Sequence, residues 1–399
     1  MNFIQDKLDV VSKKRSNLFN WRGQFTPDFV EYILDEFGTD CQQIADPFSG
    51  SGTVLQEAAR LGINAVGLEV NPSAFAMSSF FSFCSLDWTE RQDFSYRMQA
   101  KLLVDSSRLN GHPVFTDHKD YRQSYTHLID YAQRANERVE TNQERIFLMN
   151  ILFQSEKDKK LTLIDSLLRS FDYIRDSLMK LPETNSSIAA HLADSRTIAD
   201  RLVTPVDLIL TSPPYINVFN YHQNYRAITE TFGYDILRVA ESEFGSNRKN
   251  RGNRFKTVIQ YSLDMEQAIR GFWQGLAESG KLILVVGRES CVRGVAFYNS
   301  EMIRHIVNQL GGFAELHQVE RQFTNRFGQA IVEDILVFEK TAICLSTEVV
   351  GYQVANQHLK RGLLRAEPEV MPDIENAIET LLAVNQSPIF DLARVVSSC

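Results

Sequence analysis

The sequence predicts an α/β protein built on a doubly wound, Rossmann-like sheet with helices on both faces. Three stretches carry this prediction. An apolar run at 206–210 ends abruptly in Thr211-Ser-Pro-Pro-Tyr215. The segment 44–53 has the pattern of a strand end that enters a glycine-containing turn and then a helix, and the segment 63–69 is a strand that ends in an acid. Such strands are typical of a parallel sheet that is covered on both sides.

Length and composition limit the classes of protein that this sequence can encode. Of 399 residues, 44% are apolar, which suffices for one large domain and a second part. The formal net charge of −8 argues against nonspecific coating of nucleic acid but leaves room for local basic surface. Five cysteines without Cys-x-x-Cys spacing favour neither zinc nor disulfides, and no signal peptide or membrane span is indicated. We expect a cytoplasmic protein with no metal and no membrane contact.

The amino-terminal elements follow from capping and glycine signals. A helix is predicted over 27–37, because Thr26 suits the N-cap and Pro27 the first turn. In the next turn, Gly50 and Gly52 permit positive φ and a close approach of backbone to a nucleotide-like ligand. Glu69 follows at the spacing expected of a carboxylate that accepts hydrogen bonds from ribose hydroxyls.

A long segment, 75–193, separates Glu69 from the next recognisable strand pattern and exceeds a normal crossover connection. Most of it has helical periodicity, with an apolar stripe between Ile164 and Leu181. We therefore divide the chain into 1–74, a helical insertion at 75–193, a second sheet part at 194–340 and a carboxyl-terminal extension at 341–399.

The turn at 211–215 has readable chemistry. Pro213 and Pro214 donate no backbone hydrogen bonds and stiffen the chain, so their carbonyls are left as acceptors at the edge of the sheet. The Ser212 hydroxyl and the Pro213 carbonyl could hold the two N–H groups of a nucleobase amine, while Tyr215 stacks on the base. Hydrogen bonds to both N–H groups would localise the lone pair on the amine nitrogen, which could then attack an electrophile. The alternative is a rigid loop after a strand.

The rest of the chain completes the sheet. The sequence predicts a helix ending at Gly280, a strand at 281–287, a helix near 300–310, and two strands at 313–322 and 331–339 that are close enough to be antiparallel. Beyond Lys340 only one helix, 372–384, is indicated.

The motifs Asp46-Pro-Phe-Ser-Gly-Ser-Gly-Thr53 and Thr211-Ser-Pro-Pro-Tyr215 together resemble the amino-methylating DNA methyltransferases. The resemblance covers most of 20–340 and implies a seven-stranded sheet with a terminal antiparallel hairpin and S-adenosylmethionine as cofactor. The cofactor-binding residues that it implies are Gln24, Phe25, Thr26, Asp46, Pro47, Phe48, Gly50, Ser51, Gly52, Thr53, Glu69, Asp194 and Thr211. The catalytic residues that it implies are Ser212, Pro213, Pro214 and Tyr215.

Contacts to DNA are predicted in two places. A basic segment follows the catalytic turn, and in it Arg248, Lys249, Arg251, Arg254 and Lys256 are favoured for phosphate contact over a solvated loop. Asn217 and Tyr221 follow Tyr215 at a spacing that could line a base pocket. The helical insertion is either a DNA-recognition region or a structural, dimerising subdomain.

The resemblance implies a site-specific DNA methyltransferase that acts on the exocyclic amine of a flipped base. Serine at the first position of the catalytic motif favours cytosine N4, and adenine N6 is the alternative. No cysteine lies in the turn, which argues against cytosine C5 chemistry through a covalent adduct. Double-stranded DNA and a cognate restriction endonuclease are the expected partners. An RNA methyltransferase or a noncatalytic nucleic-acid-binding module would share part of this pattern.

Overall fold

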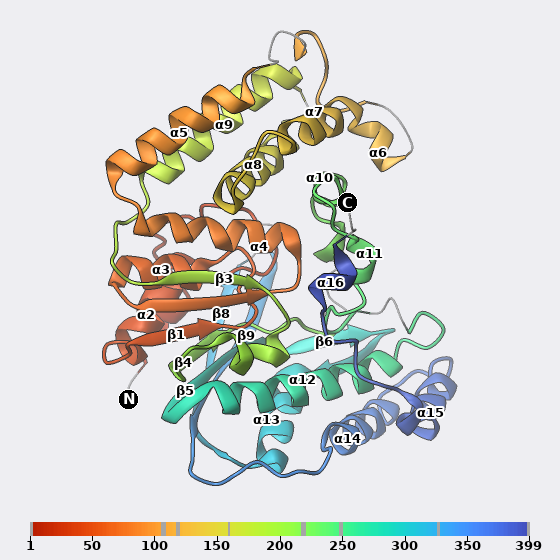
Figure 1. The fold of residues 1–399 in the computed structure, drawn as a ribbon. Coiled ribbons are helices and arrows are strands. Elements are labelled where there is room, and N and C mark those ends of the chain that lie inside the picture. Colours follow the sequence, from red (N-terminus) through yellow and green to blue (C-terminus); the bar gives the residue numbers. More distant parts are fainter. Residues whose placement is uncertain are drawn as a thin grey trace.

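One seven-stranded sheet organises the protein (Figure 1). A computed structural model describes residues 3–104, 109–116, 120–158, 160–216, 221–246, 250–324 and 328–396. The strand order is β3-β2-β1-β4-β5-β9-β8. The strands are β1 Gln43–Asp46, β2 Asn64–Glu69, β3 Ile188–Leu192, β4 Val206–Thr211, β5 Leu276–Gly287, β8 Phe313–Thr324 and β9 Ala330–Lys340. The first five strands in this order pair in parallel, β9 pairs antiparallel with β5, and β8 pairs antiparallel with β9. This arrangement confirms the predicted doubly wound sheet with a terminal antiparallel hairpin.

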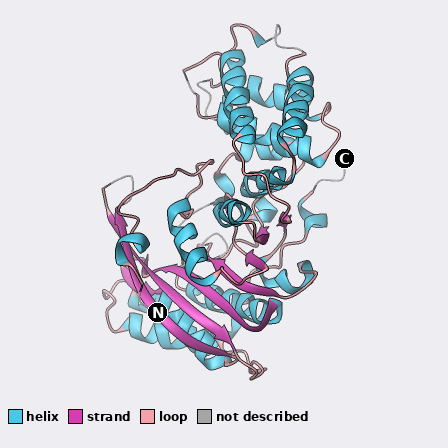
Figure 2. Ribbon diagram, turned by 90° about the vertical axis from the view of Figure 1, so that its left-hand side faces the viewer, coloured by secondary structure: helices cyan, strands magenta, loops and turns pink. Residues whose placement is uncertain are grey.

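Helices cover both faces of the sheet, and a group of helices extends beyond it (Figures 1 and 2). Those nearest the sheet are α1 Gln5–Leu8, α2 Pro27–Phe37, α3 Thr53–Leu61, α4 Pro72–Ser79, η1 Phe80–Ser85, η3 Ser195–Arg201, α12 Lys256–Gly275 and α13 Asn299–Leu310. The others are α5 Trp88–Leu102, α6 Tyr121–Ser124, α7 Thr126–Asn136, α8 Asn142–Ser155, α9 Leu163–Met179, η4 Tyr221–Gln223, α10 Arg226–Thr231, α11 Ile236–Val239, α14 Gly351–Leu363, α15 Met371–Glu379, η5 Leu381–Ala383 and α16 Leu392–Val395. A small hairpin joins β6 Glu289–Val292 to β7 Val295–Tyr298.

Side chains of successive strand residues point to opposite faces of the sheet, so the core has two halves, one on each face. Ile44, Leu208 and Leu210 are fully buried on the face covered by α2 and α3. Ala45 and Ile209 point to the opposite face, where they belong to the core that contains α12 and α13. Successive strand residues project to opposite sides, so apolar runs of this kind require cover on both.

A buried arginine ties together the two ends of the helical insertion. In Figure 1 its helices α5, α7, α8 and α9 form a group above the sheet. Arg91 on α5 is only 1% exposed. Its guanidinium donates hydrogen bonds to the carbonyls of Phe83 and Cys84 in η1 and to those of Leu178, Leu181 and Pro182 at the end of α9. A charge this deeply buried needs such complete pairing, so Arg91 fixes the base of the insertion.

Three elements differ from the sequence-based expectations. The range 75–193 contains β3, which pairs with β2 at the edge of the sheet and lacks an apolar run because most of it is only partly buried. The helix expected to end at Gly280 ends at Gly275, because Leu276 already pairs with Val206 in the sheet. The helix α14 was not predicted at all, and no capping side chain marks its start.

The carboxyl-terminal extension packs back onto the sheet part. Arg196, just after β3, donates to the carbonyls of Ser387 and Pro388. The backbone N–H of Phe390 donates to Asp194 at 2.9 Å. At the end of the chain, Val396 forms a β-bridge with Tyr234. The segment after α15 therefore closes over the loop that follows β3.

Candidate active site

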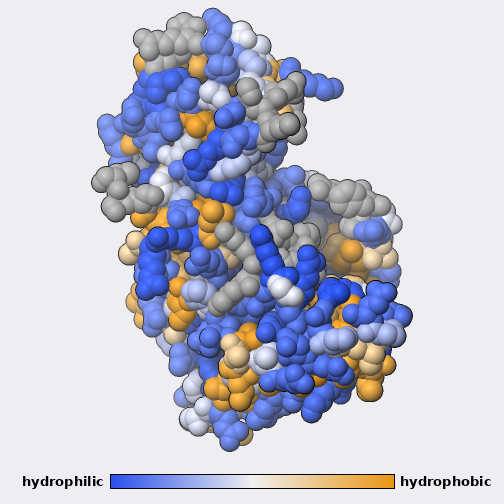
Figure 3. All heavy atoms as spheres, turned by 90° about the vertical axis from the view of Figure 1, so that its right-hand side faces the viewer, coloured by the Kyte–Doolittle hydropathy of each residue, from blue (hydrophilic) through white to orange (hydrophobic). Residues whose placement is uncertain are grey.

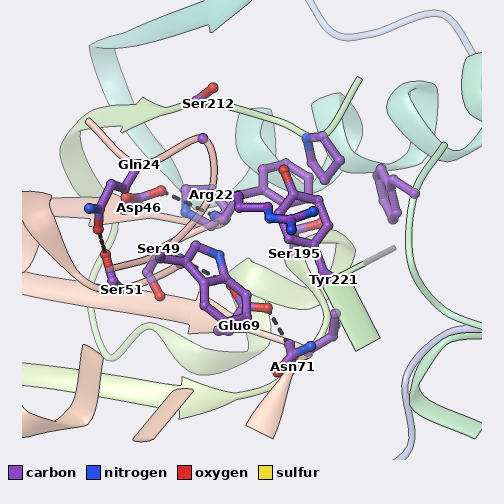
Figure 4. Close-up of a pocket in the computed structure, with 18 of the residues that line it drawn as sticks. Arg22, Gln24, Asp46, Ser49, Ser51, Glu69, Asn71, Ser195, Ser212 and Tyr221 are labelled. Carbon is purple, nitrogen blue, oxygen red and sulfur yellow. Dashed lines mark hydrogen bonds between the residues drawn. The ribbon is translucent and has the colours of Figure 1, made fainter. Parts of the chain in front are cut away.

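The loops that follow β1, β2, β3 and β4 meet in one cavity at the carboxyl ends of these strands (Figure 4). This is where a doubly wound sheet binds its ligands. The cavity encloses about 860 Å³, solvent at its mouth included. It is lined by Trp21, Arg22, Gly23, Gln24, Phe25, Asp46, Pro47, Phe48, Ser49, Gly50, Ser51, Thr53, Glu69, Val70, Asn71, Ser195, Ser212, Pro214, Tyr221, Ser242, Glu243 and Phe244. The predicted cofactor-binding and catalytic residues outside this wall are Thr26, Gly52, Asp194, Thr211, Pro213 and Tyr215.

Asp46, at the end of β1, ties the glycine turn to the neighbouring strand. Its Oδ1 accepts a hydrogen bond from the Thr211 hydroxyl at 2.6 Å and another from the backbone N–H of Phe48 at 3.1 Å. Thr211 therefore acts on the cavity through Asp46, although it does not line the wall. Burial raises the pKa of Asp46 to about 7, against the lowering effect of both hydrogen bonds.

Glu69, at the end of β2, is held by two backbone amides. Oε2 accepts from the N–H of Gly50 at 3.0 Å and Oε1 from the N–H of Asn71 at 2.8 Å. Burial raises the pKa of Glu69 to about 7, opposed by these hydrogen bonds and assisted by the nearby acids Glu243 and Asp46. The orientation of Glu69 is thus set by the glycine turn itself.

Gly52 shapes this turn without lining the cavity. Its φ of +86° is unfavourable for other residues, and a Cβ there would come within 2.7 Å of the Cα of Ser78. The turn can therefore lie directly on α4, and α3 begins immediately after it at Thr53. We predicted that Gly52 permits a close approach of backbone to a ligand. In the structure, the close approach at Gly52 is to the protein's own backbone at Ser78.

The segment before α2 is fastened to the glycine turn. The Ser51 hydroxyl donates to Gln24 Oε1, and Asn17 Nδ2 bridges the carbonyl of Phe25 and the hydroxyl of Thr53. Gln24 and Phe25 thereby lie in the wall, as predicted. Thr26 is the N-cap residue of α2, but its side chain makes no capping bond and it lines a second cavity.

Aromatic side chains form one side of the cavity. Trp21 and Tyr221 are stacked, with ring centroids 5.9 Å apart and planes 17° from parallel. Phe48 lies edge-on to Phe244 at 5.3 Å. Tyr221 was predicted as a DNA contact, and the structure places it in the wall of the cavity that contains Asp46. Flat aromatic surfaces of this kind suit a planar heterocycle.

Several wall residues were not predicted. Glu243 is a third buried acid, and its Oε2 lies 2.9 Å from Nδ1 of the buried His222. The hydroxyls of Ser49 and Ser195 are buried and make no hydrogen bond within the described part of the chain. Ser49 and Ser195 are next to predicted site residues in the sequence, and this adjacency could have identified them as wall residues. Glu243 has no local motif, because only the fold brings 242–244 to the sheet edge.

Asp194 does not have the position that was predicted for it. Its carboxylate accepts from Arg196 Nε at 2.8 Å and Nη2 at 2.6 Å, and also from the N–H of Phe390. These partners turn it toward the carboxyl-terminal segment and away from the cavity wall. The extension thus supplies one of the hydrogen-bond donors to Asp194, and the role of Asp194 in cofactor binding stays a prediction.

The catalytic turn stands at the edge of the cavity. Figure 4 shows Ser212 above Asp46, with its hydroxyl directed away from Glu69. Pro214 also lines the wall. Tyr215 lies outside the cavity. Its ring packs on Gly287 of β5, where a Cβ would be 2.6 Å from the ring, so only glycine leaves room for it. The two motifs thus meet at one cavity, with Tyr215 outside its wall.

The predicted DNA contacts are only partly placed. Asn217, Arg248 and Lys249 lie outside the described residues. Arg251 and Arg254 are exposed and Lys256 is partly buried at the start of α12, and none of these three is in the cavity wall. Their contact with phosphate stays a prediction. Within the described ranges no cluster of His, Cys, Asp and Glu could hold a metal ion, and no helix there is long and apolar enough to cross a bilayer.

Comparison with known proteins points to one family. Residues 5–79 match the family model of N6 and N4 methyltransferases, described as DNA methylase. The chain is 24% identical over 295 residues to the Type II methyltransferase M.BsoBI of Geobacillus stearothermophilus, covering 60% of this chain and 57% of that protein. It is 40% identical over 102 residues to the Type II methyltransferase M.MjaII of Methanocaldococcus jannaschii, covering 24% and 18%.

The matched regions span little more than half of the first of these relatives and a fifth or less of the second. Among solved structures, TrmN from Thermus thermophilus is 14% identical, covers 80% of this chain and 50% of its own, and has a TM-score of 0.32. The sequence matches confirm the resemblance that the two motifs carry.

Proposed function

We propose that this chain, whose sequence resembles the amino-methylating DNA methyltransferases, methylates the exocyclic amine of a base in DNA, most specifically cytosine N4. One observation carries the proposal. The acids Asp46 and Glu69 share a cavity with Ser212 and Pro214 of the Thr-Ser-Pro-Pro-Tyr turn. A methyl donor and an acceptor amine need such a meeting point, because the reacting atoms have to be held in line at contact distance.

The cavity suits S-adenosylmethionine. This cofactor carries two cationic centres, two ribose hydroxyls and a purine, and it supplies an electrophilic methyl group when bound. The carboxylates of Asp46, Glu69 and Glu243 offer acceptors and negative charge, and the aromatic side chains offer a face for the purine. The unpaired hydroxyls of Ser49 and Ser195 provide further polar groups for a ligand.

The turn residues act on the acceptor base. The Ser212 hydroxyl and the Pro213 carbonyl are proposed to accept the two amine protons, which localises the lone pair on nitrogen. Neither proline can compete by donating a backbone hydrogen bond. The base has to leave the duplex to reach this turn, which costs a few kcal/mol. Binding and orientation by the chain therefore provide the catalysis, with no covalent intermediate.

The choice of cytosine N4 over adenine N6 rests on serine at position 212, because both amines present the same two donors. The test is incubation of the purified protein with S-adenosylmethionine and duplex DNA, followed by mass spectrometry of the nucleosides. N4-methylcytosine is expected, and N6-methyladenine would replace the proposal by its alternative. Methylation of RNA alone would refute action on DNA. A cognate restriction endonuclease stays a prediction.

The helical insertion remains our candidate for DNA recognition. Figure 3 shows that one face of the molecule is mainly hydrophilic, with apolar side chains in small separate patches. Hydropathy does not distinguish basic from acidic side chains, so this face by itself does not single out DNA as the partner. Loss of duplex binding with retained cofactor binding, after charge-removing substitutions on the insertion, would support this role.

Glu69→Gln should weaken S-adenosylmethionine binding by about tenfold or more, the equivalent of one charge-assisted hydrogen bond. An amide cannot accept from both Gly50 and Asn71 at once, since one of its ends donates. Isothermal titration calorimetry gives the affinity. Glu137→Gln, at an exposed position, is the matched control and should bind like the wild type. Equal affinities of all three proteins would contradict the assignment of Glu69.

Cofactor affinity should fall as the pH drops through 7. In the free protein the pKa values of Asp46 and Glu69 are both raised to about 7. A cationic, hydrogen-donating ligand favours the ionised forms of both carboxyl groups. Below pH 7 the ligand must therefore displace protons from these groups when it binds, whereas well above pH 7 the groups are already ionised. Calorimetry in buffers of different ionisation heat should detect proton release near pH 6. A constant affinity between about pH 6 and pH 8 would refute the coupling.

A further inference from the structure

The hydroxyl of Tyr215 is part of a chain of polar groups that leaves the cofactor cavity. Ser212 Oγ and Tyr215 Oη are 3.4 Å apart. Tyr215 Oη then donates to Glu333 Oε1 at 3.1 Å. Tyr215 and Glu333 are 118 positions apart, so this link exists only because β9 lies beside β5 in the sheet.

Glu333 lies at the wall of a second cavity, which is open to solvent. This cavity adjoins the first one, since Trp21, Gly23, Gln24 and Phe25 line both. Its wall also contains Asp9, Lys13 and Arg321 as charged neighbours of Glu333. The carboxylate therefore stands between the buried tyrosine hydroxyl and a route to bulk water.

Arg321 holds the carboxylate in place. Its Nε lies 3.4 Å from Glu333 Oε2, and its side chain is only 4% exposed. The guanidinium is sandwiched between two rings, 4.0 Å from the centroid of Phe29 and 4.8 Å from that of Phe323. Stacking of this kind fixes the plane of the cation. Its Nη1 is buried and has no hydrogen-bond partner within the described part of the chain.

We propose that Ser212, Tyr215 and Glu333 form a proton exit path for the methylated amine. The inference rests on the proposed function and adds the acceptor that serine cannot provide alone. Methyl transfer leaves a positive charge on the nitrogen, which must lose one proton. That N–H bond breaks as an O–H bond forms on Ser212 Oγ, the Ser212 proton moves to Tyr215 Oη, and the Tyr215 proton moves to Glu333.

The bonds broken and formed in this proton transfer balance among groups of the substrate and of this chain. One N–H bond is lost, one O–H bond is gained on Glu333, and both hydroxyls keep one proton each. Neither hydroxyl has to exist as an anion, which suits a tyrosine whose pKa burial raises well above its usual value. Glu333 then releases the proton to water in the second cavity.

The test compares Glu333→Gln and Tyr215→Phe with the wild type in single-turnover methyl transfer to duplex DNA. Both variants keep the shape of the site but break the path. We expect the rate to fall by about tenfold or more near neutral pH, and to recover partly at about pH 9, where hydroxide can take the proton. Cofactor affinity, measured by calorimetry, should stay within about twofold.

A matched control is Glu320→Gln on the neighbouring strand β8, where the side chain is half-exposed and pairs with Arg288 at 2.7 Å. It should methylate like the wild type. Rates of both test variants within about twofold of the wild type would overturn the path, as would an equal loss at every pH, which indicates a structural role. Absence of methyl transfer by the wild type would instead refute the proposed function itself, and the path with it.

Discussion

Tyr215→Ala should lower methyl transfer by about a thousandfold, roughly 4 kcal/mol of transition-state stabilisation, while cofactor affinity changes by about threefold at most. Tyr215 lies outside the wall of the cofactor cavity. Its removal takes away the aromatic face beside the base and the middle of the hydroxyl chain. Single-turnover kinetics and calorimetry on the same preparation measure the two effects separately.

Asp46→Ala is the counterpart of this variant, and the opposite pattern is expected. Asp46 lines the cofactor cavity and holds both Phe48 and Thr211, so its loss should weaken cofactor binding by about tenfold to a hundredfold. Saturating cofactor should then restore part of the rate. Equal loss of cofactor affinity in both variants would contradict this division of roles.

A control for folding is needed, because truncation of a buried aromatic side chain to alanine costs about 3–5 kcal/mol of stability. Circular dichroism and thermal unfolding of Tyr215→Ala show whether the protein is folded at the assay temperature. Tyr215→Phe keeps the ring on Gly287 and serves as the conservative partner. A folded alanine variant that turns over like the wild type would remove Tyr215 from the site.

Arg91→Met should destabilise the protein by about 3 kcal/mol or more. The substitution leaves carbonyls of η1 and of the end of α9 without their charged donor, in a place that water does not reach. Urea unfolding followed by circular dichroism gives the free energy. We also expect limited proteolysis of this variant to cut the helices of the insertion, between Trp88 and Met179, sooner than the sheet part, because Arg91 joins the two ends of this segment.

Arg97→Met is the matched control for this prediction. Arg97 lies on the same helix and is exposed, and its guanidinium carbon is 5.9 Å from the ring centroid of Phe94. Its replacement should change the free energy of unfolding by about 0.5 kcal/mol or less. Similar losses in both variants would mean that the five carbonyl contacts of Arg91 contribute little.

Prediction from the sequence was most successful for elements whose signals lie within a few neighbouring residues. Thr26, Pro27 and Gly38 marked the bounds of α2, and the apolar run at 206–210 marked β4. The seven-stranded sheet with its terminal antiparallel hairpin was also predicted, since the resemblance carried by the two motifs implies it. Elements with weak local signals were missed, namely the partly exposed β3 and the uncapped α14. Their stability comes from neighbours that are distant in the chain.

By itself the sequence determined the chemistry at the tips of β1, β2 and β4, because motif residues are adjacent in the chain and their backbone geometry is fixed by glycine and proline. Only the tertiary structure decided what faces those tips. It brought Glu243 into the cavity, turned Asp194 toward Phe390, and set Glu333 against Tyr215. The physical reason is that a buried polar group has to find a partner, and which partner it finds depends on chain packing over long sequence separations.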